Sequence, residues 1–418
     1  MTSSTTHKPT TNRSAFAEPQ FRRYFISMCF STLAGWLVRF LFGWNAWEFT
    51  HSAFWVGVVA GSLLLPIIFF SPFFGIISDR INPRKGLVVT VGAQSLVAAL
   101  ASLASAMDML NLWSLIALSA CLGVASSAHT PIRLALVPKL VKREALPNAI
   151  GYAAIVFNTS RVLGPALGAW LVAVLSVPSA FFSATLLCVV AAIPLLLITG
   201  VRGGSHKSSA GMFSDLKQGF VYAASNRVIR LILSLTLLNA LLGRTLLELL
   251  PAFSGQLLNG TAETLATLTA AAGTGSILGG LLVTRQSGHE RVLFRMVGIA
   301  LTLAALCLFS IQWLQGLYAL CGLIFVLSML STIAGISSQA LAQLTVDEDY
   351  RGRVLSLWSM LAMGAPALGA VGIGALAQSW GFPAVTAVTG VIVLIILAVL
   401  RISSNRAAVS DQHLSRVD

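Results

Sequence analysis

The sequence predicts an all-α membrane protein that crosses the membrane twelve times, in two bundles of six helices. Composition is the first observation, since 56% of the 418 residues are hydrophobic and only 10% are charged, against roughly a quarter charged in an ordinary soluble chain. The second is that apolar runs recur from Phe25 to Ile402, which excludes a single-span protein. The third is that basic residues gather in alternate loops between these runs.

Each expected helix is an apolar run of about 20 residues or more, the length that crosses a bilayer. Charged residues or clusters of Gly, Pro and Asn bound each run. The twelve expected helices span residues 24–47, 55–78, 86–107, 112–137, 146–175, 178–200, 228–253, 263–285, 292–313, 316–343, 353–379 and 382–402.

A polar stretch from Val201 to Asn226 divides these helices six and six. We therefore expect a tail (1–23), a first bundle (24–200), a linker (201–227), a second bundle (228–402) and a second tail (403–418). Within the linker, Met212 to Ala224 predicts a short amphipathic helix along the membrane surface.

The net charge of +13 fits either a nucleic-acid surface or a topology signal. Of the 27 Lys and Arg, 24 fall in the tails or around the loops that follow even-numbered helices, Arg133 among them. This dispersion argues against nucleic acid. Because basic residues concentrate on the cytoplasmic side, we expect both termini in the cytoplasm and the chain in a bacterial inner membrane.

The two halves share a short repeat. The segment GPALGA in the fifth expected helix recurs as APALGA in the eleventh, which predicts a bend at each proline and close packing at each glycine. These helix-bend residues are Gly164, Pro165, Gly168, Pro366 and Gly369. A six-helix unit duplicated in one orientation is typical of transporters whose halves rock around a central cavity, although a purely structural role for these residues stays open.

The run from Gly75 to Lys85 (GIISDRINPRK) resembles the signature between the second and third helices of the major facilitator superfamily. With twelve spans and the repeated proline segment, the resemblance covers nearly the whole chain. The stretches Gly35–Ser52 and Pro131–Ala149, together with Arg161 before Gly164, are similar to the enterobactin-exporter-like branch. The resemblance implies the major facilitator fold and a transport function.

The same resemblance implies a cytoplasmic gate. Asp79 would pair with a basic residue and a helix N-terminus to hold the halves closed on the inside, with Gly75 allowing close helix approach. Arg80 and Arg84 would pair locally or hold lipid phosphates. In the fourth helix Ser119 stands where the family has a membrane arginine, so no proton-coupling role is implied there.

Three arginines, Arg39, Arg161 and Arg244, fall inside expected helices. A charged residue at the bilayer centre costs ~3 kcal/mol or more, so it normally faces a cavity or a partner. Asn158 shares one helical face with Arg161, and Arg244 is spaced to pair with Glu248 at i and i+4.

Two interpretations of these charges stay open. In the first, Arg39, Asn158, Arg161, Arg244 and the nearby Trp36 bind a polar or anionic cargo, and Glu248 accepts the coupling proton. In the second, the arginines form salt bridges that only fix helix positions.

The expected function is secondary active export of a small polar or anionic metabolite, with a siderophore as first cargo and proton antiport as driver. Efflux of amphipathic drugs and flipping of lysophospholipids are the alternatives. No catalytic constellation or phosphate loop supports an enzyme or direct use of ATP. No cofactor or metal is expected, because the five cysteines lack CxxC spacing and His129 is interpreted as a packed or interfacial residue and not a ligand. Expected partners are the cargo, protons and membrane lipids, with the chain monomeric.

Overall fold

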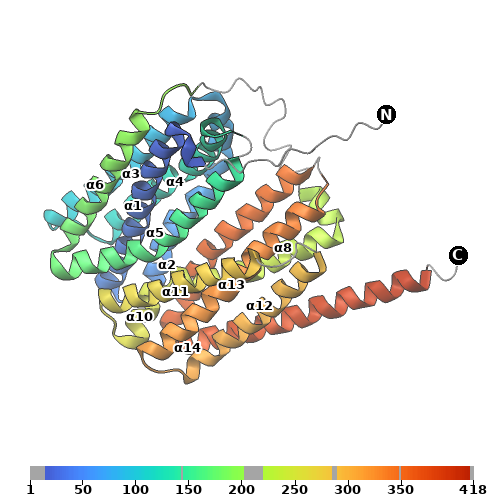
Figure 1. Ribbon diagram of the computed structural model, residues 1–418. Helices are drawn as coiled ribbons and strands as arrows, with labels where there is room; N and C mark the ends of the chain where they lie inside the picture. The colour runs from blue at the N-terminus through green and yellow to red at the C-terminus, as the bar shows by residue number, and fades with distance from the viewer. Residues whose placement is uncertain (1–14, 143–144, 202–219, 285–289, 348–349, 415–418) are drawn as a thin grey trace, which may run out of the picture.

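The computed structural model describes residues 15–142, 145–201, 220–284, 290–347 and 350–414, and every regular element in these ranges is helical (Figure 1). Helices are what the apolar runs dictate, since a segment that crosses lipid must satisfy its backbone hydrogen bonds internally. The all-α prediction is therefore confirmed.

The first six spans are uninterrupted helices. They are α1 (Pro19–Thr50), α2 (Ala53–Arg80), α3 (Pro83–Ala106), α4 (Leu112–Leu140), α5 (Leu146–Val174) and α6 (Val177–Leu196). Asn82, Asn111 and Ser176 cap α3, α4 and α6 by accepting hydrogen bonds from first-turn N–H groups. Proline stands in the first turn of α1, α3, α5 and α6, where its missing N–H removes no helical bond.

The seventh span is broken into four consecutive pieces. They are α8 (Arg227–Asn239), a five-residue π-helical turn (Ala240–Arg244), α9 (Thr245–Glu248) and α10 (Leu250–Leu258). A π-helical turn inserts an extra residue into a helix, and Pro251 in the first turn of α10 cannot continue the hydrogen-bond ladder. Glu248 consequently lies directly before the second break.

The remaining spans are α11 (Ala262–Thr284), α12 (Glu290–Ser310), α13 (Leu317–Thr345) and α14 (Arg351–Leu414). Within α14, Gly381 has a φ of 77° and kinks the helix where the sequence predicted a turn between two spans. Eleven helices among the described residues are long and apolar enough to cross a membrane. Since α14 contains two such crossings, the total is the predicted twelve.

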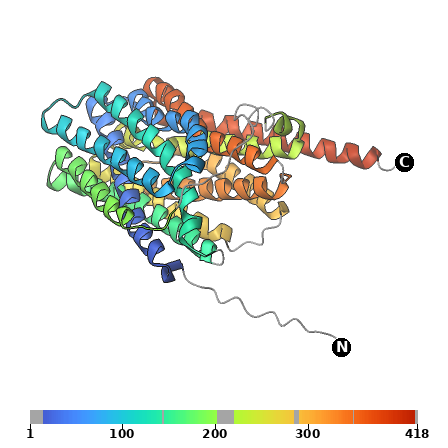
Figure 2. The same ribbon diagram turned by 90° about the horizontal axis from the view of Figure 1, so that it is seen from above.

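Two expectations near the chain's polar segments fare differently. The helix α14 continues to Leu414, past the expected end at residue 402 (Figure 2). The expected surface helix at 212–224 lies mostly outside the described residues. The part that the structure describes begins at residue 220, and residues 220–225 are helical.

We call the end of the molecule where α1 begins the near end, and the end where α1 finishes the far end. Helices α1–α6 pack on one another, as do α8–α14, and the two groups meet where α2 lies along α14 and α5 along α11 (Figure 1). These two pairs of helices frame the space between the groups.

At the far end the two groups touch backbone to backbone. Gly57 lies against the carbonyl group of Ala370, and Gly374 lies against the carbonyl group of Ala53. The N–H of Ala53 also donates to Oε1 of Gln378 at 2.9 Å. A side chain on either glycine would push α2 and α14 apart, so glycine is what permits this contact.

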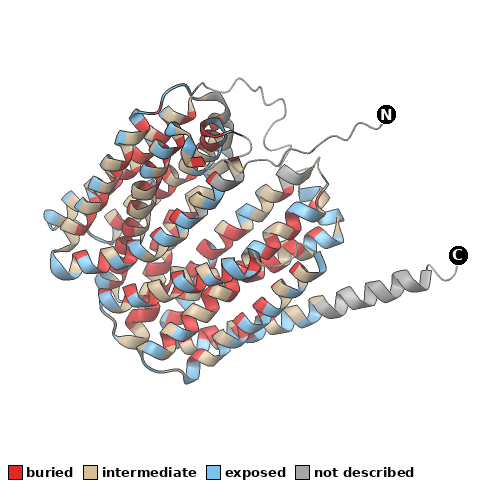
Figure 3. Cartoon of the chain, in the orientation of Figure 1, coloured by how far each residue is buried: buried red, intermediate tan, exposed pale blue. Residues whose placement is uncertain are grey.

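The outer surface of the molecule is apolar. Exposed large side chains such as Trp113 (70% exposed) and Val89 (69% exposed) lie on the outside, while the contacts between helices are buried (Figure 3). A soluble protein rarely exposes apolar patches on this scale. With the twelve crossings, this surface identifies a multi-pass membrane protein.

Candidate functional site

A cavity of about 370 Å³ lies between the two helix groups. It extends from the middle of the molecule toward the near end, from Arg39 to Ser31 along α1 and from Leu122 to Arg133 along α4. The group α8–α14 contributes Arg244, Glu248 and Met363 among others. The cavity therefore brings together residues from both groups.

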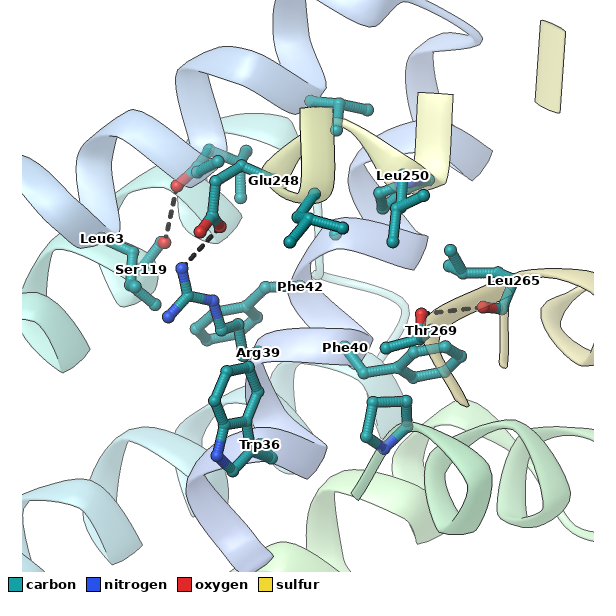
Figure 4. A pocket seen from close by; sticks show the side chains of 17 residues that line it. Trp36, Arg39, Phe40, Phe42, Leu63, Ser119, Glu248, Leu250, Leu265 and Thr269 are labelled. Carbon is teal, nitrogen blue, oxygen red and sulfur yellow. Dashed lines mark hydrogen bonds and ion pairs between the residues drawn. The ribbon is translucent and has the colours of Figure 1, made fainter. Parts of the chain in front are cut away.

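An ion pair between Arg39 and Glu248 crosses the space between the groups at the far limit of this cavity (Figure 4). Nη2 of Arg39 lies 2.5 Å from Oε2 of Glu248, and the side chains are 29% and 16% exposed. Since α1 supplies the arginine and α9 the carboxylate, the pair joins the two groups at mid-depth.

Beyond this pair toward the far end lies a smaller pocket of about 90 Å³ (Figure 4). Apolar side chains, including Phe40, Phe42 and Leu265, form most of its wall. Arg39 and Glu248 border both spaces. The ion pair therefore lies where the larger cavity and this pocket meet, together with Trp36, Leu63, Leu247, Leu250 and Thr269.

Trp36 lies between two of the predicted arginines. The guanidinium carbons of Arg39 and Arg161 are 5.4 Å and 5.7 Å from the centre of its ring, which is within the range of cation–π attraction. Phe157 meets the same indole edge to face at 5.6 Å. The structure therefore brings Trp36, Arg39 and Arg161 into one cluster.

Arg161 also reaches across to the other helix group. Its Nη1 donates to Oγ of Ser276 on α11 at 2.9 Å. The Oγ of Ser276 in turn lies 2.8 Å from the hydroxyl of Ser328 and 3.0 Å from the hydroxyl of Thr332, both on α13. This buried hydroxyl network gives the charge of Arg161 a neutral partner but no counter-charge.

The partner of Glu248 corrects one prediction from the sequence. Spacing predicted an i, i+4 pair between Arg244 and Glu248, yet the carboxylate lies on Arg39, and Nη2 of Arg244 points to the sulfur of Met363 at 4.0 Å. That prediction assumed one regular helix facing its own side chains. The π-helical turn and the break after Glu248 instead present the carboxylate to α1.

Asn158 is the predicted cargo residue that the structure does not bring in. It is half-buried on α5, and it is absent from the described residues that line the cavity. Its neighbours Phe157 and Arg161 do line the cavity.

Two residues that sequence reasoning placed elsewhere line the cavity: Arg133 and His129 on α4. Nδ1 of His129 lies 3.1 Å from the hydroxyl of Thr90, which donates its proton to the carbonyl of Leu87 at 3.0 Å. The sequence carried a signal for both, since they are one helical turn apart inside the expected span 112–137. Arg133 had been assigned to the loop charges because it lies near the end of that span.

The helix-bend residues pack each repeat copy against the first span of its own group. Gly164 lies against Trp36 and Leu37 of α1, and Gly168 lies against Phe40. In the second copy Gly369 lies against Thr245 of α9. Pro165 borders the smaller pocket toward the far end (the far pocket), and Pro366 borders the larger cavity (the main cavity). The repeated sequence therefore has a repeated position beside the site.

The residues expected to form the cytoplasmic gate lie close to the near end of the molecule. The side chains of Asp79 and Arg80 are outside the described residues, and Gly75 has open space where a Cβ would stand. Arg84 donates to the carbonyl groups of Leu195 and Leu196 at 3.0 Å and 2.5 Å. In this structure Arg84 thus caps the C-terminus of α6, where a cation is favourable.

The charged groups of the cavity are strongly unequal in sign. Arg39, Arg133, Arg161 and Arg244 line it against the single carboxylate of Glu248, among the residues that the structure describes. Charges in such a setting are costly without partners. The arrangement can therefore bind an anion, with Trp36 and Phe157 offering an aromatic wall beside it.

Comparison with known proteins places the chain among transporters. A family model described as transmembrane secretion effector matches residues 10–416. The staphyloferrin A transporter of Staphylococcus aureus (strain NCTC 8325 / PS 47) is 24% identical over 375 residues, which cover 88% of this chain and 92% of that protein. The uncharacterized MFS-type transporter YfiS of Bacillus subtilis (strain 168) is 23% identical over 405 residues, covering 93% and 94%.

Solved structures share the fold at low sequence identity. A POT family transporter in complex with 5-aminolevulinic acid has a TM-score of 0.73 at 12% identity, covering 94% of this chain and 99% of that one. A bacterial homolog of the human lysosomal transporter Spinster, inward-facing and unoccupied, has a TM-score of 0.68 at 14% identity, covering 94% and 98%. These likenesses concern the fold alone.

Proposed function

The chain belongs to the transmembrane secretion effector family of major facilitator transporters, and from this premise we propose that it exports a small anionic metabolite, with a siderophore as first cargo. As a member of this family it is a transporter of small molecules and not an enzyme. The direction of transport, the identity of the cargo and the energy source that drives transport all belong to the proposal.

The observation that carries the proposal is the excess of positive charge around the cavity. Four arginines face one carboxylate there, and such an imbalance is stabilised when an anion occupies the space. The relative named as a staphyloferrin A transporter supports a siderophore as the cargo class.

The direction follows from the proposed topology. Among the described residues, the near end bears Arg22, Arg23, Arg84 and Lys85, and by the positive-inside rule we propose that this end lies in the cytoplasm of a bacterial inner membrane. The main cavity then faces inward to collect cargo, while the far-end glycine contacts close the outside. A negative-inside potential favours anion exit by ~2.3 kcal/mol per charge per 100 mV.

We propose Glu248 as the proton acceptor. In the ion pair its carboxylate neutralises Arg39, whereas protonation would leave Arg39 free for an anionic cargo. The carboxylate of Glu248 and an anionic cargo would in this way compete for one arginine, so that cargo binding depends on the protonation state of Glu248.

The remaining parts of the transport cycle follow the family pattern. The bundles 24–200 and 228–402 would rock as two bodies around the cavity, joined by the linker 201–227, in a monomer surrounded by lipid. Asp79, aided by Gly75 and Arg80, would hold the cytoplasmic end closed once cargo has moved outward. An Asp79→Asn variant should then insert normally and fail in net export.

Efflux of amphipathic drugs is the second candidate, and the aromatic wall formed by Trp36 and Phe157 favours it. The two functions separate in a deletion strain of the host. Export of a siderophore predicts a smaller secreted pool of iron chelator, restored by the wild-type gene and not by Arg39→Ala. An unchanged pool with greater sensitivity to amphipathic drugs would favour efflux instead.

A further inference from the structure

Arg133 and His129 form a group of cavity residues separate from the Arg39–Trp36–Arg161 cluster. Arg133 lies seven residues from the near end of α4, and Arg161 lies fifteen residues from the near end of α5. At 1.5 Å per residue these depths are ~10 Å and ~22 Å. The two cationic positions are therefore ~12 Å apart along the cavity axis.

We propose that Arg133 forms a second anion subsite, with His129 beside it as a hydrogen-bond acceptor, so that the cargo is an extended polyanion with carboxylate groups at both ends. The inference rests on the proposed function and specifies its substrate class. One end of the cargo binds between Arg39, Arg161 and Trp36, and the other binds at Arg133.

The ring of His129 is held in a fixed orientation at this subsite. The hydroxyl of Thr90 has one proton, and it donates that proton to the carbonyl of Leu87. Its contact with Nδ1 of His129 at 3.1 Å must then be one in which Thr90 accepts and Nδ1–H donates. Nδ1 is thereby occupied, and Nε2 of the neutral ring is left to accept a hydrogen bond from a hydroxyl or N–H group of the cargo in the cavity that the ring lines.

Polar neighbours make this end of the cavity suitable for a solvated anion. Gln94 of α3, Thr130 of α4 and Ser31 of α1 line the same cavity. Amide and hydroxyl groups complete the hydrogen bonds of a carboxylate whose charge rests on an arginine. A cargo with a single anionic group would fill one cluster and leave the other to water.

Binding of two simple acids tests the subsite. Sebacate carries carboxylates at both ends of a ten-carbon chain, and octanoate carries one on a similar apolar chain. With wild-type protein in lipid nanodiscs, calorimetry should show sebacate binding ~10- to 100-fold more tightly, the gain expected for a second charged hydrogen-bonding partner.

Arg133→Gln should remove this preference by weakening sebacate and leaving octanoate unchanged. Lys139→Gln is the matched control, since it removes the same charge from α4 at an exposed position that does not line the cavity. Arg133→Lys should restore part of the preference, which separates loss of charge from misfolding.

The outcomes distinguish the two proposals. If Arg133→Gln and Lys139→Gln keep the full preference for sebacate, the second subsite is wrong while the anionic cargo stands. The same holds if wild type binds the two acids equally. If wild type binds neither acid, the anionic cargo falls and the subsite falls with it.

Discussion

The closed far end rests on contacts between the backbones of α2 and α14, and Gly374→Ala tests them. An added Cβ would lie 2.5 Å from the carbonyl oxygen of Ala53, whereas ordinary contact begins at 3.4 Å. The helices would have to part by nearly 1 Å, which would also stretch the bond from Ala53 N–H to Gln378. Overpacking of this kind costs ~1–3 kcal/mol, which shifts the population toward an open far end by ~5- to 150-fold.

The matched control is Gly372→Ala on the same helix, because a Cβ there meets open space. Both variants are made in a cysteine-free background that carries Leu265→Cys in the far pocket, a position that is 1% exposed. An impermeant maleimide applied outside intact cells should label the cysteine faster in Gly374→Ala than in Gly372→Ala, by a factor in the range above. Equal labelling of the two well-expressed variants would refute the claim that this contact holds the far end closed.

Three further outcomes are expected. Glu248→Gln should bind anionic cargo roughly tenfold more tightly, because Arg39 loses its competing carboxylate, and its transport should no longer respond to a pH gradient across proteoliposomes. Arg161→Ala should weaken cargo binding by ~10- to 100-fold, the value of a charged hydrogen bond, with an unchanged elution profile in detergent. At the near end, the hydrogen bond to Asp347 raises the pKa of Tyr222. This bond therefore stabilises the fold below about pH 10 and is lost as the pH rises further. The melting temperatures of Tyr222→Phe and wild type should differ below pH 10 and converge above it.

Each of these has a result that would contradict it. Proton-driven transport by Glu248→Gln would assign coupling to another group. Normal binding by a folded Arg161→Ala protein would reduce that arginine to a structural role. Tyr222→Phe keeps the ring that stacks on Tyr350 at 4.1 Å between ring centres, so a melting difference that persists at high pH would show that ionisation of the phenol does not break the contribution of this hydroxyl.

Hydropathy sufficed for the number of spans, because a segment that crosses lipid must satisfy its backbone hydrogen bonds as helix, but it did not reveal the breaks in the seventh span. The position of Arg39, Arg161 and Trp36 in one cluster also followed from sequence, since mid-membrane charges have few places to lie. The partner of Glu248 did not follow, because it depends on a π-helical turn and on a contact more than two hundred residues away. Arg133 was missed because, from the sequence alone, a basic residue near a helix end fits two roles equally well: a loop charge that sets the topology, or a charge that lines the cavity.

The far-end contact has a consequence for how this protein can change. Closure there depends on glycines, main-chain groups and the side chain of Gln378, none of which lines the cavity. Substitutions at Arg133, His129 or Phe157 would therefore alter which compound is carried without altering how the molecule shuts. Laboratory evolution of new cargo can thus be confined to the cavity wall, with the glycines of α2 and α14 kept constant.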